Sequence, residues 1–353
     1  RTLIMALVSK WSLANPIYRI LSWTGILLIL YVFFKIISFF HVSCCCFWGI
    51  VVAVVIGESM RDKLKIEPDG KAVLITGCDS GFGLHFSEHL LKNGFLIISG
   101  VLDMNSDGAK YLQELSPKRL IVVKLDVKSD KEVQDAVSTV SNITAEKKSV
   151  LWAIVNNAGV SRTGPFEFLP MEDHELTFRV NVLGAMRVSK MFLPLMRRSK
   201  GRFINVTSAV RIAGTRFCTP YSVSKFAAEG LAQCMRYELQ HMGIKVICVE
   251  PSFFVNCTNL IRNTHLQELI EDSRKNLTEE QSQFYNAKYF SMLRDLEQIM
   301  KTAGHKSDDL MMEALELSIC SRYPSSKYLA TDFLGSALYI MSFLPDIIYR
   351  QLD

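Results

Sequence analysis

The residues best suited to chemistry in this chain are a tyrosine and a lysine one helical turn apart. Tyr221 and Lys225 lie in the run 219–225, downstream of Ser208. Because positions i and i+4 of a helix share one face, the phenol and the ammonium can approach the same point. A cation beside a phenol favours the phenolate and lowers its pKa from about 10 towards neutrality. Tyr221 is therefore a candidate general acid or base, although the same spacing is also common on helix surfaces.

A glycine-rich turn near residue 80 has the surroundings of a phosphate-binding site. The apolar run 71–76 predicts a buried strand, and apolar residues at helical spacing predict a helix over 84–93. Between them, glycines allow the backbone to approach a pyrophosphate, whose charge is met by the helix N-terminus. The residues predicted to contact a nucleotide cofactor here are Thr76, Gly77, Ser80, Gly81, Phe82 and Gly83.

A second predicted strand, 95–102, ends at an acidic residue, Asp103. At about twenty residues beyond a glycine turn, a carboxylate can hydrogen-bond the ribose of an adenosine and repel a 2′-phosphate. Asp103 therefore predicts that the cofactor is NAD rather than NADP. The alternative is that Asp103 merely begins a loop.

Two further predicted strands, 120–125 and 150–155, end in polar or small residues. Ligands of open α/β sheets bind beyond the carboxyl ends of the strands, which is where these residues fall. The cofactor contacts predicted at these two ends are Asp126, Val127, Asn157, Ala158 and Gly159.

In their order and spacing, these motifs resemble those of the short-chain dehydrogenase/reductase family. The motifs are Thr76-Gly77-x-x-x-Gly81-x-Gly83, Asn156-Asn157-Ala158-Gly159, Asn181, Ser208 and Tyr221-x-x-x-Lys225. The resemblance is close over 71–258 and looser from there to the C-terminus. The phrases 75–83 and 192–202 are similar to the branch that contains D-β-hydroxybutyrate dehydrogenase, type 2 11β- and 17β-hydroxysteroid dehydrogenases and retinol dehydrogenases.

The resemblance implies an α/β fold, with a doubly wound parallel sheet of about seven strands, and hydride transfer between a substrate carbon and the nicotinamide of NAD. It implies that Ser208 hydrogen-bonds the substrate oxygen and that Tyr221 exchanges its proton. Lys225 would lower the pKa of the tyrosine and hold the nicotinamide ribose, and Asn181 would anchor a water in the proton path. Taken singly, Ser208 and Asn181 would be assigned to capping or loop roles.

One position departs from the family pattern. After the predicted strand 244–249 the family usually has Pro-Gly, whereas this chain has Pro251-Ser252. If the backbone there needs a positive φ or a close approach to the cofactor, a side chain is unfavourable. The resemblance also implies that Tyr221, Lys225, Pro251 and Thr258 contact the cofactor, with Thr258 contacting the amide group of the cofactor.

The first 57 residues have the composition of a membrane anchor. Between Arg19 and Glu58 the one fully charged residue is Lys35, and the runs 20–34 and 36–57 are almost wholly apolar. The second run exceeds the roughly 20 residues needed to cross a bilayer. The expectation is an N-terminal transmembrane segment of one or two spans within 20–57, a linker over 58–70, and a cytosolic catalytic domain, favoured by a slight excess of basic residues after the spans.

The catalytic domain is expected over 71–320. Charged helical segments over 259–306 would cover the substrate, and an apolar tail over 321–353 would pack as core or rest on the membrane. Aromatic and methionine side chains of the covering helices could line a pocket or face the core. They are Phe284, Tyr285, Tyr289, Phe290 and Met292.

Composition excludes some functions. A net charge of +5 without a clustered basic stripe predicts no nucleic-acid partner, and nine cysteines without metal-ligand spacing predict no metal site. The expected partners are a membrane, a lipid-like small-molecule substrate and, by analogy, a second copy of the chain.

The function expected is that of a membrane-anchored, NAD-dependent alcohol dehydrogenase acting on a hydrophobic secondary alcohol, a steroid first and a retinoid next. The endoplasmic reticulum is favoured over the mitochondrial inner membrane. A first alternative is a D-3-hydroxybutyrate dehydrogenase, which would need a cation for the carboxylate, such as Arg211 or Arg216. A second alternative is a membrane-tethered NAD-binding scaffold with little turnover, for which the Pro251-Ser252 step is the one argument.

Overall fold

The computed structural model describes residues 64–209, 217–258 and 264–331, apart from gaps at 292, 294, 296–301 and 303, together with a few isolated positions before residue 64. The chain divides into two compact units, Arg1–Lys63 and Leu64–Asp353. Most of the predicted membrane anchor lies outside the described residues. Within the part that is described, no helix has the length and hydropathy needed to cross a membrane.

The second unit contains a parallel sheet of seven strands in the order β3-β2-β1-β4-β5-β6-β7. The strands are β1 (Lys71–Thr76), β2 (Leu96–Val101), β3 (Leu120–Lys124), β4 (Val150–Asn156), β5 (Arg202–Val206), β6 (Lys245–Pro251) and β7 (Lys327–Ala330). The strand order reverses between β1 and β4, which confirms the predicted doubly wound sheet. Strand β7 extends the sheet into the segment predicted as a tail.

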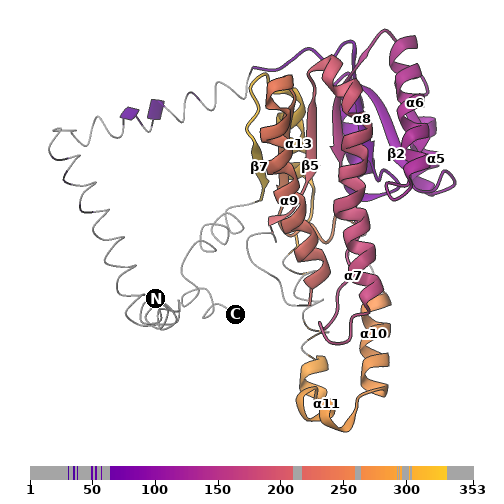
Figure 1. Ribbon diagram of the computed structural model, residues 1–353, viewed down its shortest axis with the longest axis vertical. Helices are drawn as coiled ribbons and strands as arrows, with labels where there is room; N and C mark the ends of the chain where they lie inside the picture. The colour runs from indigo at the N-terminus through magenta and orange to yellow at the C-terminus, as the bar shows by residue number, and fades with distance from the viewer. Residues whose placement is uncertain are drawn as a thin grey trace, which may run out of the picture. The chain divides into compact units, whose positions relative to one another are not determined.

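Helices cover both faces of the sheet (Figure 1). One face packs against α4 (Gly81–Lys92), α5 (Asp107–Leu115) and α13 (Asp309–Cys320), and the other against α6 (Asp130–Glu146), α8 (Ala185–Ser199) and α9 (Thr219–Leu239). The strands carry apolar side chains on both faces because alternate side chains, such as Leu74 and Ile75, enter different cores. Helix α7 (Met171–Phe178) continues into the π-helical segment η1 (Arg179–Gly184), and a 3-10 turn, η3 (Gln240–Met242), follows α9.

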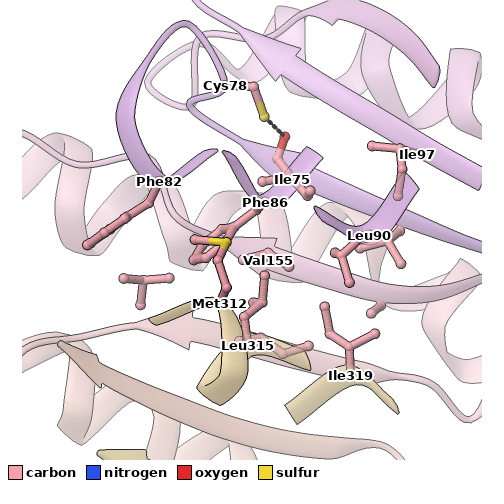
Figure 2. Close-up of a cluster of buried hydrophobic side chains, with 14 of the residues drawn as sticks. Ile75, Cys78, Phe82, Phe86, Leu90, Ile97, Val155, Met312, Leu315 and Ile319 are labelled. Carbon is pink, nitrogen blue, oxygen red and sulfur yellow. Dashed lines mark hydrogen bonds between the residues drawn. The ribbon is translucent and has the colours of Figure 1, made fainter. Parts of the chain in front are cut away.

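Helix α4 is held in place by its apolar stripe. Phe82, Phe86 and Leu90 recur every four residues and are buried in the core that β1 forms with α13. Figure 2 shows them beside Met312 and Leu315 of α13. Because the core fixes the helix along its length, the position of its N-terminus at the end of β1 is also fixed.

A buried arginine joins the sheet to the end of α13. Arg202 of β5 donates from Nη1 to the carbonyl oxygens of Ser318 (2.8 Å) and Ser321 (3.0 Å), and its guanidinium lies 4.5 Å from the ring centroid of Trp152. Burial lowers the pKa of Arg202 to about 10. The arginine therefore satisfies carbonyl groups that the helix terminus leaves without partners.

Replacing Arg202 with alanine is expected to lower the free energy of unfolding by about 3 kcal/mol, because buried carbonyls lose their donor and a cavity opens beside Trp152. Chemical denaturation of the full chain in detergent measures the loss. The matched control is Arg198→Ala, an exposed arginine of α8 whose replacement should change stability by less than about 0.5 kcal/mol. Equal losses in the two variants would contradict this role.

Candidate active site

The carboxyl ends of β1 and β4 are joined by side-chain hydrogen bonds. Thr76 Oγ1 accepts from the backbone N–H groups of Asn157 (3.1 Å) and Ala158 (3.0 Å). Asn157 Nδ2 donates to the carbonyl oxygens of Thr76 (2.9 Å) and Gly77 (3.1 Å). The glycine turn and the end of β4 therefore keep a fixed separation at the point where the strand order reverses, which is where ligands bind in such sheets.

Two glycines of the turn are required by its geometry. Gly77 has φ +72°, and a Cβ there would lie 2.8 Å from Ala158 Cα; at Gly83 it would lie 2.2 Å from the Gly77 carbonyl oxygen. Gly77 and Gly81 line a cavity of about 590 Å³ that also receives Ser80 and Phe82. Glycines at these positions leave room for a pyrophosphate at the start of α4, where the helix N-terminus offers backbone N–H groups, so a dinucleotide fits the residues present.

Asp79 was not singled out by the sequence analysis, yet it organises the adjoining strand end. Its carboxylate accepts from the backbone N–H groups of Leu102 and Asp103, both at 2.9 Å, and from Ser106 Oγ at 3.4 Å. The Asp103 side chain is exposed and accepts from the N–H of Asn105 (2.9 Å). Asp79 and Leu102 line the cavity, whereas Asp103 lies outside its lining.

The end of β3 contributes Asp126 and Val127 to the cavity wall. The Asp126 backbone N–H donates to Glu132 (2.8 Å), and its carboxylate accepts from the N–H of Lys128 (2.9 Å). Val127 is buried against Gly184, where a Cβ would come within 2.6 Å of the valine side chain. This close approach fixes the π-helical segment against β3.

Asn181 lies in that π-helical segment and is buried. Its Oδ1 accepts from the N–H of Val160 (2.8 Å), and its Nδ2 donates to the Val160 carbonyl (2.9 Å) and to Ser224 Oγ (2.9 Å). Ser224 Oγ in turn donates to the Tyr221 carbonyl (2.7 Å). Asn181 is thus two hydrogen bonds from the backbone of Tyr221 and does not itself line the cavity. The water that it was predicted to anchor stays a prediction.

Ser208, Tyr221 and Lys225 come together at one wall of the cavity. Tyr221 lies in the first turn of α9 and is hydrogen-bonded to Ser208, which follows β5. Lys225 Nζ lies 5.4 Å from the centroid of the Tyr221 ring and donates to the Val206 carbonyl (2.8 Å). The spacing on the helix therefore places the phenol and the ammonium on one face, as predicted.

The pKa of Tyr221 moves in the direction opposite to the prediction. Burial raises it to about 12, and the hydrogen bond with Ser208, which lowers it, is the smaller effect. Burial also lowers the pKa of Lys225 to about 8. The predicted lowering of the tyrosine pKa was wrong for this structure because desolvation exceeds the effect of an ammonium that is directed at a carbonyl group.

The step from β6 into the following loop is unstrained. Ser252 is not among the described residues with positive φ, and its Oγ lies 2.9 Å from Nε2 of His305. Pro251, which ends β6, and Thr258 both line the cavity. A Cβ at Gly81 would lie 3.5 Å from Thr258 Cα, so the loop ends beside the glycine turn.

The rest of the cavity wall is mostly apolar. The basic residues in the described lining are Lys128, Arg162 and Lys225. Arg162 Nε lies 3.1 Å from Asp173 Oδ1. Arg211 and Arg216, predicted as possible carboxylate partners, lie outside the described residues. The apolar wall residues beyond the cofactor contacts include Leu176, Val180, Cys218, Phe253 and Val255.

The predicted aromatic pocket residues mostly form a small core instead. Phe290 is 1% exposed and packs with Tyr285 and Tyr289 against Phe168, whereas Phe284 is 70% exposed. The cavity lining contains none of the four predicted residues Phe284, Tyr285, Tyr289 and Phe290, and Met292 lies outside the described residues. The cluster belongs to the segment that contains α10 (Thr264–Lys275) and α11 (Glu279–Phe284). Throughout the described part of the chain, no group of histidine, cysteine, aspartate or glutamate residues could hold a metal ion.

Comparison with known proteins places this architecture in a family. The family model for short chain dehydrogenase matches residues 71–268. D-beta-hydroxybutyrate dehydrogenase, mitochondrial, of Bos taurus is 36% identical over 82% of this chain and 85% of its own, and estradiol 17-beta-dehydrogenase 2 of Rattus norvegicus is 33% identical over 82% and 74%. The chain therefore belongs to the short-chain dehydrogenase/reductase family. It is an oxidoreductase of the dehydrogenase type, dependent on a nicotinamide dinucleotide.

Solved structures of the family share the fold. A short-chain dehydrogenase from Streptomyces avermitilis superposes with a TM-score of 0.64 at 22% identity, covering 81% of this chain and 96% of that one. Another from Burkholderia cenocepacia, in complex with NADP, has a TM-score of 0.57 at 20% identity, over 81% and 99%. At these identities the likeness concerns the fold alone.

With Tyr221 as the predicted proton-exchanging group, its raised pKa predicts a pH dependence of the reaction. Alcohol oxidation needs the phenolate as proton acceptor, whereas ketone reduction needs the phenol as donor. Because Tyr221 stays protonated at neutral pH, the initial rate of oxidation is expected to rise with pH between about 6 and 8, where Lys225 keeps its charge, by up to tenfold per unit, while reduction does not rise. Initial rates measured in both directions at constant ionic strength test this, and an oxidation rate independent of pH would contradict it.

Proposed function

We propose that this chain is a membrane-anchored, NAD-linked dehydrogenase that transfers hydride between NAD(H) and a hydrophobic secondary alcohol or ketone, with a steroid as the first candidate and a retinoid as the second. The observation that carries this proposal is the apolar wall beside Ser208, Tyr221 and Lys225. An apolar wall stabilises a hydrocarbon substrate by removing its surface from water, and it offers few groups to a small polar one.

The catalytic roles follow from the position of each group. Ser208 and Tyr221 can both hydrogen-bond one substrate oxygen, and Tyr221 exchanges the proton of that oxygen. Lys225 places a cation beneath the tyrosine ring, where it favours the phenolate during oxidation. NAD, when bound, accepts or supplies the hydride. The protein accelerates the reaction by holding the oxygen and the proton acceptor in one place.

NAD is proposed over NADP because of two carboxylates. Asp79 lies in the cavity lining, and Asp103 lies at the end of β2 with its backbone fixed by Asp79. A 2′-phosphate brought to this strand end would meet negative charge, and the N–H groups of Leu102 and Asp103 that could otherwise bind it already donate to Asp79.

A small hydroxy acid is the second candidate substrate, supported by the identity to D-beta-hydroxybutyrate dehydrogenase. Such a substrate needs a cation for its carboxylate, and Arg162, one of the basic residues of the cavity wall, could provide one. Arg162 already pairs with Asp173, whose carboxylate would compete with the substrate carboxylate for the guanidinium. This competition favours the hydrophobic substrate. The scaffold alternative is less favoured because Ser252 does not have a positive φ, which was one of the two ways in which a side chain there could disturb the loop.

Membrane attachment is proposed from the apolar runs 20–34 and 36–57. A sparingly soluble substrate reaches such an enzyme through the bilayer. The endoplasmic reticulum remains the first proposal for location and the mitochondrial inner membrane the second, and a homo-oligomer remains an analogy with the family.

The cofactor preference can be tested by replacing Asp103 with serine. Removal of the exposed charge is expected to raise kcat/KM for NADP relative to NAD by about tenfold, a change of about 1.4 kcal/mol. Asp107→Ser is the matched control, because Asp107 is an exposed carboxylate a few residues further on in α5 and should leave the ratio unchanged. Initial rates with each cofactor give the ratio, and an unchanged ratio in the Asp103 variant would remove that residue from the cofactor site.

The function itself is tested by NADH formation from NAD in membranes that contain the full chain, with hydroxysteroids, retinol and 3-hydroxybutyrate as candidate substrates. Tyr221→Phe is expected to lower turnover of the true substrate by at least about 100-fold, because the proton acceptor is lost. Tyr237→Phe is the control, since Tyr237 lies on the same helix and is 79% exposed. Turnover of 3-hydroxybutyrate alone would select the second candidate, and turnover that survives in Tyr221→Phe would refute the catalytic assignment.

A further inference from the structure

We propose that His305 is a positioning residue for the dinucleotide: it holds the loop after β6 in its binding conformation, chiefly through a hydrogen bond with Ser252. The inference rests on the proposed function in that the ligand is NAD(H). It adds a residue that lies far from every motif in the sequence and outside the cavity lining.

The loop concerned begins at the end of β6 and ends beside the glycine turn. It forms much of one wall of the cavity, so its conformation decides the shape of the site. The loop residues in the cavity lining are Pro251, Ser252, Phe253, Phe254, Val255 and Thr258. A wall made of loop rather than of strand or helix needs external contacts to stay in one conformation.

His305 provides those contacts at three successive loop residues. Its Nε2 lies 2.9 Å from Ser252 Oγ, its backbone N–H donates to the Phe253 carbonyl (2.7 Å), and its ring stacks on Phe254 with centroids 4.3 Å apart. The adjoining residue extends the contact, since Asn256 Nδ2 donates to the Gly304 carbonyl (3.1 Å). Two residues, 304 and 305, thus hold most of the loop.

The histidine is itself fixed to the helix that starts at the glycine turn. Phe254, on which it stacks, meets Phe82 of α4 edge to face, with centroids 5.5 Å apart. Three residues further on, Asp308 pairs with His85 of α4 at 2.5 Å. Asp308 is the N-cap residue of α13, whose side chains Met312 and Leu315 are packed among those of α4 in Figure 2. The segment that holds the loop is therefore anchored on the phosphate side of the site.

This arrangement explains how a serine is accommodated at position 252. Its hydroxyl has a partner, and its backbone hydrogen-bonds to Ala330 of β7 (3.1 Å). Without the Ser252–His305 hydrogen bond, the loop would sample more conformations and would have to be ordered when the dinucleotide binds, which weakens binding. Ser208, Tyr221 and Lys225 make no described contact with His305, so the chemical step should be little affected once the cofactor is bound.

The test is a double-mutant cycle on the affinity for NADH, measured by quenching of tryptophan fluorescence in the full chain. Ser252→Ala removes the hydroxyl, and His305→Phe removes Nε2 while it keeps a ring to stack on Phe254. Each single variant is expected to raise the Kd for NADH about fivefold, as for the loss of one hydrogen bond. The double variant should also raise the Kd about fivefold, and not by the product of the two single effects, because both substitutions remove the same hydrogen bond. Ser252→Thr retains the hydroxyl and should restore most of the affinity.

Three further measurements separate positioning from a general structural role. The KM for NAD should rise in parallel with the Kd, with kcat at saturating NAD nearly conserved and the thermal unfolding midpoint unchanged. His241→Phe, a replacement of an exposed histidine next to α9, should not change the Kd. The role of His305 would be overturned if the single variants left the Kd for NADH unchanged, or if their effects on the Kd multiplied in the double variant. A wild-type chain that binds no NADH would instead overturn the proposed function.

Discussion

The structure depends on the close approach of two strand ends that are adjacent in the sheet and distant in the sequence. Strands β1 and β4 meet where the strand order reverses, and Thr76 and Asn157 lock their ends together through four hydrogen bonds. Everything in the site is placed relative to this junction. The glycine turn approaches β4 so closely that a Cβ at Gly77 would collide with Ala158. A side chain there would force the two halves of the sheet apart, and the cleft with them.

The two ends of the cavity differ in how far their charged and polar groups are exposed to solvent. At the phosphate end, backbone N–H groups and carboxylates are partly open to solvent. At the other end Tyr221 and Lys225 are buried, and the cost of burying charge dominates both pKa values, raising one and lowering the other. At neutral pH the phenol therefore keeps its proton, and Lys225 is still charged but loses its proton more readily than an exposed lysine. A buried ammonium that donates to a carbonyl group is a costly arrangement for stability, of the kind that is common at functional sites.

The residues that the sequence analysis identified are those whose chemistry depends on local spacing. Glycines between a strand and a helix, and a tyrosine and lysine one turn apart, could be assigned because a strand or a helix places near neighbours predictably. Asp79 and His305 could not be found in this way, because their partners are 23 and 53 residues away and are brought near only by the sheet. The pKa of Tyr221 was predicted in the wrong direction because burial cannot be judged from spacing. The aromatic residues after α11 were placed in a pocket or in the core, and distinguishing between these required the packing of Phe290.

The contact between Asn256 and Gly304 has a consequence for how such a protein can change over evolution. The long stretch between them leaves the sheet and returns to nearly the same point, because its two ends are hydrogen-bonded to each other. A stretch whose two ends are joined in this way can gain, lose or exchange residues at a small cost, because the entropy of loop closure depends only weakly on the length of the loop. The stretch can therefore change in length or sequence while Ser252, which follows the end of β6, and His305 keep their contact with each other.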